Sequence, residues 1–187
     1  MAVMDKFFLD RNHAVLVVVD VQEKLCLAMD PEVLAQLKKN TGILLEAAKE
    51  LGIPVVVTEQ YVKGLGCTVP ELREKIEGDA YEKMTFSCCG DQAFLNRMAE
   101  LGRRQVIVTG METHVCVLQT VLELLERDYR VHLVKDAVMS RKKENWEVGL
   151  ITSQAAGAVV TSTEAALFQL LRVAGTEEFK KLSKLVR

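Results

Sequence analysis

The chain has 187 residues, of which 49% are hydrophobic and 27% are charged, and 24 Lys and Arg residues against 26 Asp and Glu residues give a net charge of −2. This length predicts one domain, residues 1–187, with a self-sufficient core. The charge balance disfavours nucleic acid and anionic membranes as partners, because both attract proteins through clustered Lys and Arg. The longest apolar run, residues 14–19, is far shorter than the roughly 18 residues that a membrane span requires.

Residues 1–10 mix acidic and apolar side chains and do not resemble a signal peptide. The chain has five cysteines, an odd number that includes the adjacent Cys88 and Cys89. This usage favours a reducing compartment over a secreted disulfide framework. We therefore expect a cytoplasmic protein, with an organelle of reducing character as the alternative.

Apolar runs of strand length alternate along the chain with longer segments of helical period, which predicts a parallel sheet flanked by helices. The run at residues 14–19 is β-branched and continuous, as in a strand covered on both faces, and similar runs follow at 53–58, 105–109, 130–134 and 156–160. Helical spacing of apolar residues predicts helices over 31–51, 91–101, 113–127, 144–153 and 164–173, and from residue 177. Together these elements predict a three-layer α/β Rossmann-like fold with a mostly parallel sheet of five to six strands.

Three positions near the ends of the predicted elements carry candidate chemistry. Asp20 follows the first strand, where ligands bind in open α/β sheets, although an aspartate there is also a common helix cap. Cys116 lies in a first helical turn, where the helix dipole favours a thiolate, although a buried cysteine is usually a small hydrophobic residue. Lys83 lies in segment 59–89, which is predicted to be irregular. Irregular segments above a rigid sheet often contain functional residues, although a lone lysine usually points at water.

Taken together, the segments around these positions resemble the three motifs of the isochorismatase-like hydrolases, in the cysteine hydrolase branch. The segments are residues 18–22 (VVDVQ), 83–87 (KMTFS) and 110–117 (GMETHVCV). They occur in the family's order and at about its spacing. The resemblance extends from the first predicted strand to the strand near Val160.

The resemblance implies a catalytic triad made of Asp20, Lys83 and Cys116. Lys83 is expected to stabilise the thiolate, and Asp20 to accept its proton and later activate water against a covalent thioester. We expect the pKa of Cys116 to lie below the usual value of about 8.5. The resemblance also implies an oxyanion hole formed by the backbone amides of Glu112 and Cys116, with a cis peptide bond between Met111 and Glu112.

Departures from other branches of the family narrow the expected chemistry. Family members that cleave a vinyl ether lack the cysteine, so its presence points to amide, ureido or related carbonyl hydrolysis. Nicotinamidase-type members carry metal-binding histidines after the second strand, where residues 59–61 of this chain are Glu, Gln and Tyr. The three histidines, His13, His114 and His132, are not at ligand spacing. We therefore expect neither a metal ion nor a cofactor.

The substrate itself is not defined by the sequence, since residues 58–72 resemble a subgroup whose natural substrates are undefined. We expect Tyr61 and Phe86 to wall a small pocket, with polar contacts from Gln22 and Thr113, although Phe86 is equally suited to a core position. The prediction is a metal-independent cysteine hydrolase that acts on a small molecule and forms a homo-oligomer. The alternative is a catalytically weak or silent oligomeric scaffold on the same fold. A nucleic-acid-processing role is opposed by the charge balance and by the lack of a phosphate-cradling glycine loop.

Overall fold

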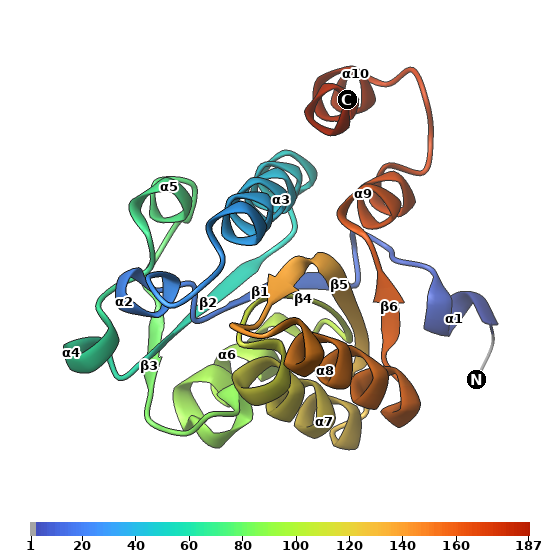
Figure 1. Ribbon diagram of the computed structural model, residues 1–187. Helices are drawn as coiled ribbons and strands as arrows, with labels where there is room; N and C mark the ends of the chain where they lie inside the picture. The colour runs from blue at the N-terminus through green and yellow to red at the C-terminus, as the bar shows by residue number, and fades with distance from the viewer. Residues whose placement is uncertain (1–2) are drawn as a thin grey trace.

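All six strands of the sheet run parallel, in the order β3-β2-β1-β4-β5-β6. This architecture comes from a computed structural model that describes residues 3–187 (Figure 1). The strands are β1 (Ala14–Val19), β2 (Val55–Gln60), β3 (Tyr81–Lys83), β4 (Gln105–Met111), β5 (Arg130–Met139) and β6 (Val159–Thr161). The predicted α/β fold with a parallel sheet flanked by helices is confirmed.

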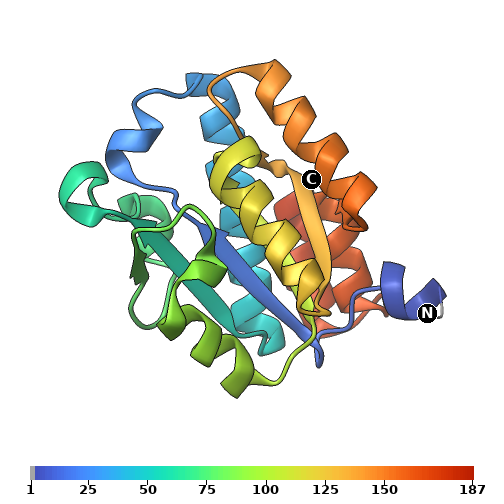
Figure 2. The same cartoon turned by 90° about the horizontal axis from the view of Figure 1, so that it is seen from below.

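Helices cover both faces of this sheet. Figure 1 shows α3, α9 and α10 over one face and α6, α7 and α8 over the other, and Figure 2 shows the second group lying across the sheet. The helical segments are α1 (Val3–Phe7), α2 (Glu23–Cys26), α3 (Pro31–Leu51), α4 (Val62–Leu65), α5 (Pro70–Arg73), η1 (Cys88–Gly90), α6 (Gln92–Leu101), η2 (Thr113–Val117), α7 (Leu118–Glu126), α8 (Lys143–Ala156), α9 (Thr163–Leu171), α10 (Glu177–Leu182) and η3 (Ser183–Val186). No helix within residues 3–187 is both long and apolar enough to cross a membrane.

The central strand β1 explains why its sequence is continuously apolar. Its alternate side chains enter two separate cores: Ala14, Leu16 and Val18 pack on the α3 side, and the three valines between and after them pack on the α7 side. All six residues are buried. A strand that is covered on both faces has no polar alternation, so its apolar run reports burial directly.

Local capping explains where the crossover helix α3 begins and ends. The Oδ1 atom of Asp30 accepts hydrogen bonds from the backbone amides of Glu32 and Val33, at 3.0 and 3.1 Å. Gly52 ends the helix in the left-handed conformation, with φ of 65°. The predicted range of 31–51 is confirmed.

The structure differs from the predicted elements at several places, of which β5 is one, since it extends to Met139 and not to residue 134. Strand β3 lies within the segment predicted to be irregular. Its three residues are too few to form a visible sequence pattern, and the strand is defined by its pairing with β2. The predicted strand at 156–160 begins later, since Ala156 still belongs to α8. The predicted helix at 113–127 begins with a π-helical turn, η2, before α7.

Candidate active site

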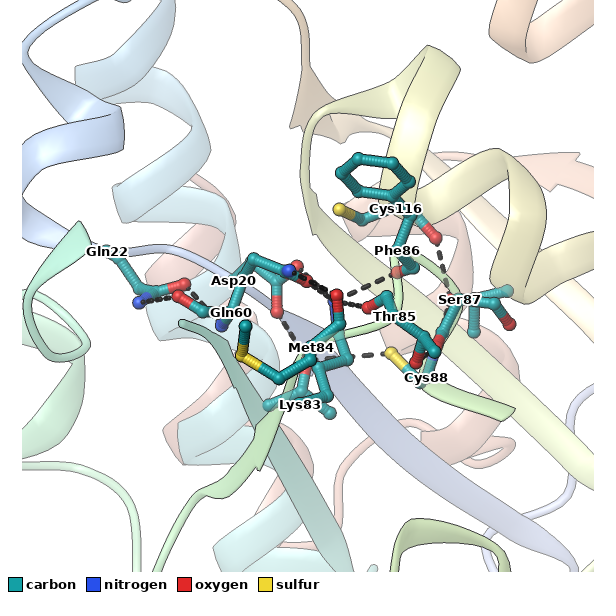
Figure 3. A network of polar contacts seen from close by, with 12 residues as sticks. Asp20, Gln22, Gln60, Lys83, Met84, Thr85, Phe86, Ser87, Cys88 and Cys116 are labelled. Atoms are coloured by element: carbon teal, nitrogen blue, oxygen red, sulfur yellow. Dashed lines mark hydrogen bonds and ion pairs between the residues drawn. The ribbon is translucent and has the colours of Figure 1, made fainter. Parts of the chain in front are cut away.

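The structure brings Asp20, Lys83 and Cys116 together at the carboxyl ends of the strands (Figure 3). Asp20 follows β1, Lys83 is the last residue of β3, and Cys116 lies in η2 beyond the end of β4. These strands are distant in sequence, but parallel strands present their carboxyl ends at the same edge of the sheet. All three side chains are buried, with Asp20 fully inaccessible and Cys116 only 6% exposed.

The Asp20 carboxylate is held from two neighbouring strands. Its Oδ1 atom accepts a hydrogen bond from Thr58 Oγ1 at 2.8 Å, and its Oδ2 atom accepts one from Lys83 Nζ at 2.7 Å. The backbone of Asp20 is in the left-handed region, with φ of 51°, a conformation that costs energy and is found at functional sites. The side chain therefore faces the site and does not cap a helix.

The Lys83 ammonium lies within hydrogen-bonding distance of four acceptors. These are Asp20 Oδ2 and Gln60 Oε1, both at 2.7 Å, the Phe86 carbonyl at 2.9 Å and the Thr85 carbonyl at 3.2 Å. An ammonium group has three N–H donors, so the longest of these contacts shares a donor with another. This environment satisfies the charge without water, and the solvent-exposed alternative for Lys83 is wrong.

Thr120 anchors the turn that carries Cys116. The Thr120 hydroxyl donates to the Cys116 carbonyl at 2.6 Å and accepts a hydrogen bond from the Cys88 backbone amide at 2.9 Å. Both contacts are buried. One hydroxyl thus joins η1 to the π-helical turn η2, which fixes the backbone beneath the candidate nucleophile.

The resting protonation state of Cys116 differs from the sequence expectation. Burial and, after it, the charge of the nearby Asp20 carboxylate raise the pKa of Cys116 well above its usual range. The positive charge of Lys83 lowers the pKa but offsets only part of this increase. This direction is opposite to the expected lowering of the pKa and favours the protonated thiol, so the reaction requires a base that removes the proton. Only the tertiary structure reveals the burial and the adjacent carboxylate that produce this result.

The expected cis peptide bond between Met111 and Glu112 is present. Just before it, Gly110 has φ of 112°, and a Cβ atom built on it would lie 2.0 Å from the Val19 carbonyl oxygen. Only glycine permits this approach of β1 and β4. The buried Glu112 carboxylate accepts hydrogen bonds from the backbone amide and Nε of Arg141, at 3.0 and 3.1 Å. These contacts hold the turn expected to carry the oxyanion hole.

The four expected substrate contacts have different surroundings. Tyr61 and Phe86 are 44% and 55% exposed, so neither belongs to the core. In Figure 3 the Phe86 ring projects on the same side of the network as Cys116. Thr113 is fully buried, and its hydroxyl has no hydrogen-bond partner within the described part of the chain.

Gln22 has a different role from the one expected. Its Oε1 atom accepts from the Gln60 backbone amide at 2.7 Å, and its Nε2 atom donates to the carbonyls of Gln60 and Gly66, at 2.9 and 2.6 Å. These bonds use both of the amide's N–H donors. We therefore interpret Gln22 as a residue that holds the loop after β2, in place of the expected substrate contact.

Residues 59–61 are engaged within the protein. Glu59 Oε1 accepts from both the backbone amide and the hydroxyl of Thr68, at 2.6 and 2.7 Å, and Gln60 bonds Lys83 and the Met84 carbonyl. Within residues 3–187, no three His, Cys, Asp or Glu side chains are grouped so that they could hold a metal ion. The donor set at this position therefore does not fit the metal site of the nicotinamidase-type members.

Sequence reasoning missed Thr58, Gln60, Thr120 and Arg141, which hold the candidate triad and the turn around it. Each lies within a strand, a helix or a surface loop whose sequence contains no motif that marks a functional residue. Their roles depend on partners that lie far away in the sequence, 38 residues away for Thr58 and 29 for Arg141. No local signal would have identified them.

Comparison with known proteins supports the resemblance. Residues 14–165 match the isochorismatase domain family. A protein of Phytophthora sojae (strain P6497), named secreted isochorismatase effector Isc1, is 42% identical over 153 residues, which are 79% of this chain and 73% of that protein. A structure described as MAR1 ribonuclease from Caenorhabditis elegans superposes with a TM-score of 0.88 at 35% identity, over 96% of this chain and 92% of that chain.

A more distant structure shares the fold. The YcaC gene product of Escherichia coli, described as an octameric hydrolase of unknown specificity, superposes with a TM-score of 0.87 at 23% identity, over 95% of this chain and 90% of that chain. The match covers most of this chain and includes positions 20, 83 and 116. The chain therefore belongs to the isochorismatase family.

Proposed function

We propose that the protein is a metal-independent cysteine hydrolase that cleaves a C–N bond in a small amide, ureido or related carbonyl compound. The observation that carries this proposal is the fully buried ion pair between Lys83 and Asp20, at 2.7 Å, beside Cys116. Desolvating two charges is costly, and buried charge clusters next to a potential nucleophile are typical of catalytic sites.

The proposed reaction begins with proton transfer from the Cys116 thiol to Asp20 as Sγ attacks the carbonyl carbon of the substrate. Lys83 stays an ammonium and stabilises the negative charge that the attack creates. The backbone amides of Glu112 and Cys116 donate to the oxyanion. When the tetrahedral intermediate collapses, the C–N bond breaks, the amine leaves with the proton held by Asp20, and a thioester remains on Cys116.

The second half of the reaction uses the same groups. Asp20 takes a proton from a water molecule, and the resulting hydroxide attacks the thioester carbonyl. The carboxylic product leaves as the C–S bond breaks, and the proton returns to Cys116. We propose that Tyr61 and Phe86 flank the substrate and that the Thr113 hydroxyl, which has no partner within the described residues, makes a polar contact with it.

The test is a screen of small amides, ureides and carbamoyl compounds against the wild type and the Cys116→Ala and Asp20→Asn variants. Each variant should abolish turnover, and the double variant should lose no more than either single one, because nucleophile and base act as a unit. Cys67→Ala is the matched control, since Cys67 is an exposed thiol outside the site, and it should retain activity. Chelator treatment should leave the rate unchanged. Wild-type rates in Cys116→Ala would overturn the proposal.

A second candidate function is RNA cleavage, because one relative at 35% identity is described as a ribonuclease. The net charge of −2 argues against it, since RNA binding requires neutralisation of phosphates. Incubation with a single-stranded RNA at low salt distinguishes the two. Cleavage that disappears in Cys116→Ala would assign the site to RNA, whereas intact RNA together with amide turnover would support the hydrolase.

We further propose that the protein forms a homo-oligomer and resides in the cytoplasm. The octameric description of the Escherichia coli protein motivates the first proposal, and five free thiols motivate the second. Light scattering at micromolar concentration tests the assembly, and a monomer mass would overturn it. A homo-oligomer that hydrolyses none of the screened compounds would instead favour the scaffold alternative.

A further inference from the structure

A cavity that does not contain the candidate triad lies between α3, the end of β5 and α8. It has a volume of about 570 Å³ and is bounded by the first turns of α3, the end of β5 and the start of α8. None of Asp20, Lys83 and Cys116 lines it. Its volume is within the range of about 300–1,000 Å³ that small-molecule sites occupy. The cavity is therefore large enough for a ligand of its own.

Part of the lining is apolar and includes an aromatic ring. Val138 and Met139, at the end of β5, are buried beneath the cavity, and Val33 of α3 contributes an exposed apolar side chain. The partly buried Trp146 indole lies on the α8 side, and its Nε1 atom donates to the Lys135 carbonyl at 3.3 Å. This bond restrains one edge of the ring, and the indole face provides a flat surface for an apolar ligand.

The two acidic residues of the lining are already committed to helix ends. Asp30 Oδ1 accepts from the first amides of α3, and Asp136 Oδ1 accepts from the backbone amide and hydroxyl of Thr163, at 2.8 and 3.0 Å. Their charges are therefore spread over amide and hydroxyl donors of the protein. This arrangement reduces their repulsion of an anion in the cavity.

The cationic residues of the lining retain free donors. Arg141 uses its backbone amide and Nε to bind Glu112, and within residues 3–187 its two terminal nitrogens donate no hydrogen bond. Lys143 has one partner in the same range, Glu147, at 3.9 Å. Lys135 adds a third positive charge. A guanidinium whose Nε is anchored by a buried carboxylate presents its other two nitrogens in a fixed plane, which suits an anionic group.

We propose that this cavity binds a small organic monoanion with a flat apolar body. The ring of the ligand lies against Trp146 and the apolar residues, and its carboxylate or similar head contacts Arg141 and Lys143. Two features of the lining favour a ligand of this kind. The apolar wall favours a ring, and the unpaired N–H donors of the cationic residues favour one negative charge. The lining does not include Cys116, so binding in this cavity can be tested without a known substrate.

Trp146 is the single tryptophan of the chain, so its fluorescence reports directly on the cavity. The experiment titrates benzoate into the full-length protein, with benzyl alcohol as the ring without the charge and acetate as the charge without the ring. Benzoate should give a saturable change in fluorescence, and each partial probe should bind about tenfold more weakly or worse. A linear response, or equal affinity for benzoate and benzyl alcohol, would overturn the proposal.

Substitutions locate the binding within the protein. Arg141→Gln and Lys143→Gln should each raise the dissociation constant for benzoate about fivefold or more. The matched control is Lys142→Gln, which removes the same charge from the neighbouring residue outside the lining and should change the constant less than twofold. If Arg141→Gln fails to fold because Glu112 loses its partner, the exposed Lys143 decides the question. Cys116→Ser should bind benzoate like the wild type, and loss of binding there would place the ligand at the triad and overturn the proposal.

Discussion

Replacing Lys83 with methionine tests the energetic role of the buried ion pair. Methionine keeps most of the side-chain volume but removes the charge and all the hydrogen bonds of the ammonium group. The Asp20 carboxylate would then remain fully buried, with Thr58 as its retained hydrogen-bond donor from the neighbouring strand. We expect the variant to be less stable and inactive.

The expected cost follows from the geometry. At the observed separation of 2.7 Å, the attraction between the two charges is roughly 6 kcal/mol at an effective dielectric constant of about 20. Desolvation of both ions offsets much of this attraction in the native protein. Removing one partner leaves the other charge buried and uncompensated, and such changes cost about 3–5 kcal/mol. This is a large fraction of the roughly 5–15 kcal/mol by which folded proteins are stable.

Urea unfolding followed by far-ultraviolet circular dichroism measures the cost, at one fixed protein concentration so that assembly does not vary. The ion pair between Lys38 and Glu71 is the matched control, because its N–O distance is also 2.7 Å but Glu71 is 59% exposed. Lys38→Met should cost about 1 kcal/mol or less. The double variant Lys83→Met, Asp20→Asn should cost less than the sum of the two single changes. A loss below about 1 kcal/mol for Lys83→Met, or strict additivity with Asp20→Asn, would refute this reasoning.

Four further predictions concern pH, thiol reactivity and backbone geometry. Burial raises the pKa of the thiols of Cys26, Cys88, Cys89 and Cys116, so their contribution to stability is complete below the ordinary value of 9.0 and decreases as the pH rises above it. Urea unfolding from pH 8 to pH 10.5 should show this decrease. At neutral pH, iodoacetamide should modify the exposed Cys67 before any of these four buried thiols. Burial lowers the pKa of His132 from 6.5 to about 4, so stability should decrease as the pH falls through this range, and His132→Leu should flatten that decrease in the same assay. Gly110→Ala places a Cβ atom 2.0 Å from the Val19 carbonyl oxygen and should lower the melting temperature strongly. The control is Gly52→Ala, whose Cβ atom meets nothing within 4 Å and which should lower it far less. Equal shifts in melting temperature would contradict the close approach of β1 and β4.

Much of the fold could be predicted because its patterns are local. The continuous apolar run of β1 and the caps of α3 are properties of neighbouring residues, and both elements occur as predicted. Strand β3 could not be predicted, because three residues carry no periodicity and their conformation depends on pairing with Thr58, Glu59 and Gln60 of β2. The conformation of a short edge strand depends on pairing with the neighbouring strand more than on its own sequence.

The candidate site divides in the same way. The residue types at positions 20, 83 and 116, and their resemblance to three family motifs, were enough to select Asp20, Lys83 and Cys116 from the sequence. That Lys83 is buried and reaches Asp20 could only be learned from contacts across 63 residues. The same holds for Gln22, whose amide proved to be bonded to the backbone of a loop about 40 residues away.

The sequence by itself determined the alternation of the five longer strands with the main helices, the parallel sheet and the identity of the three candidate catalytic side chains, because periodicity, caps and motifs are properties of adjacent residues. Only the tertiary structure decided the direction in which the pKa of Cys116 is shifted and the presence of a cavity beside Trp146. Both depend on burial and on the distances between charges from separate strands. Those quantities are set when the chain packs, since the energy of a charge depends on its surroundings more than on its neighbours in sequence.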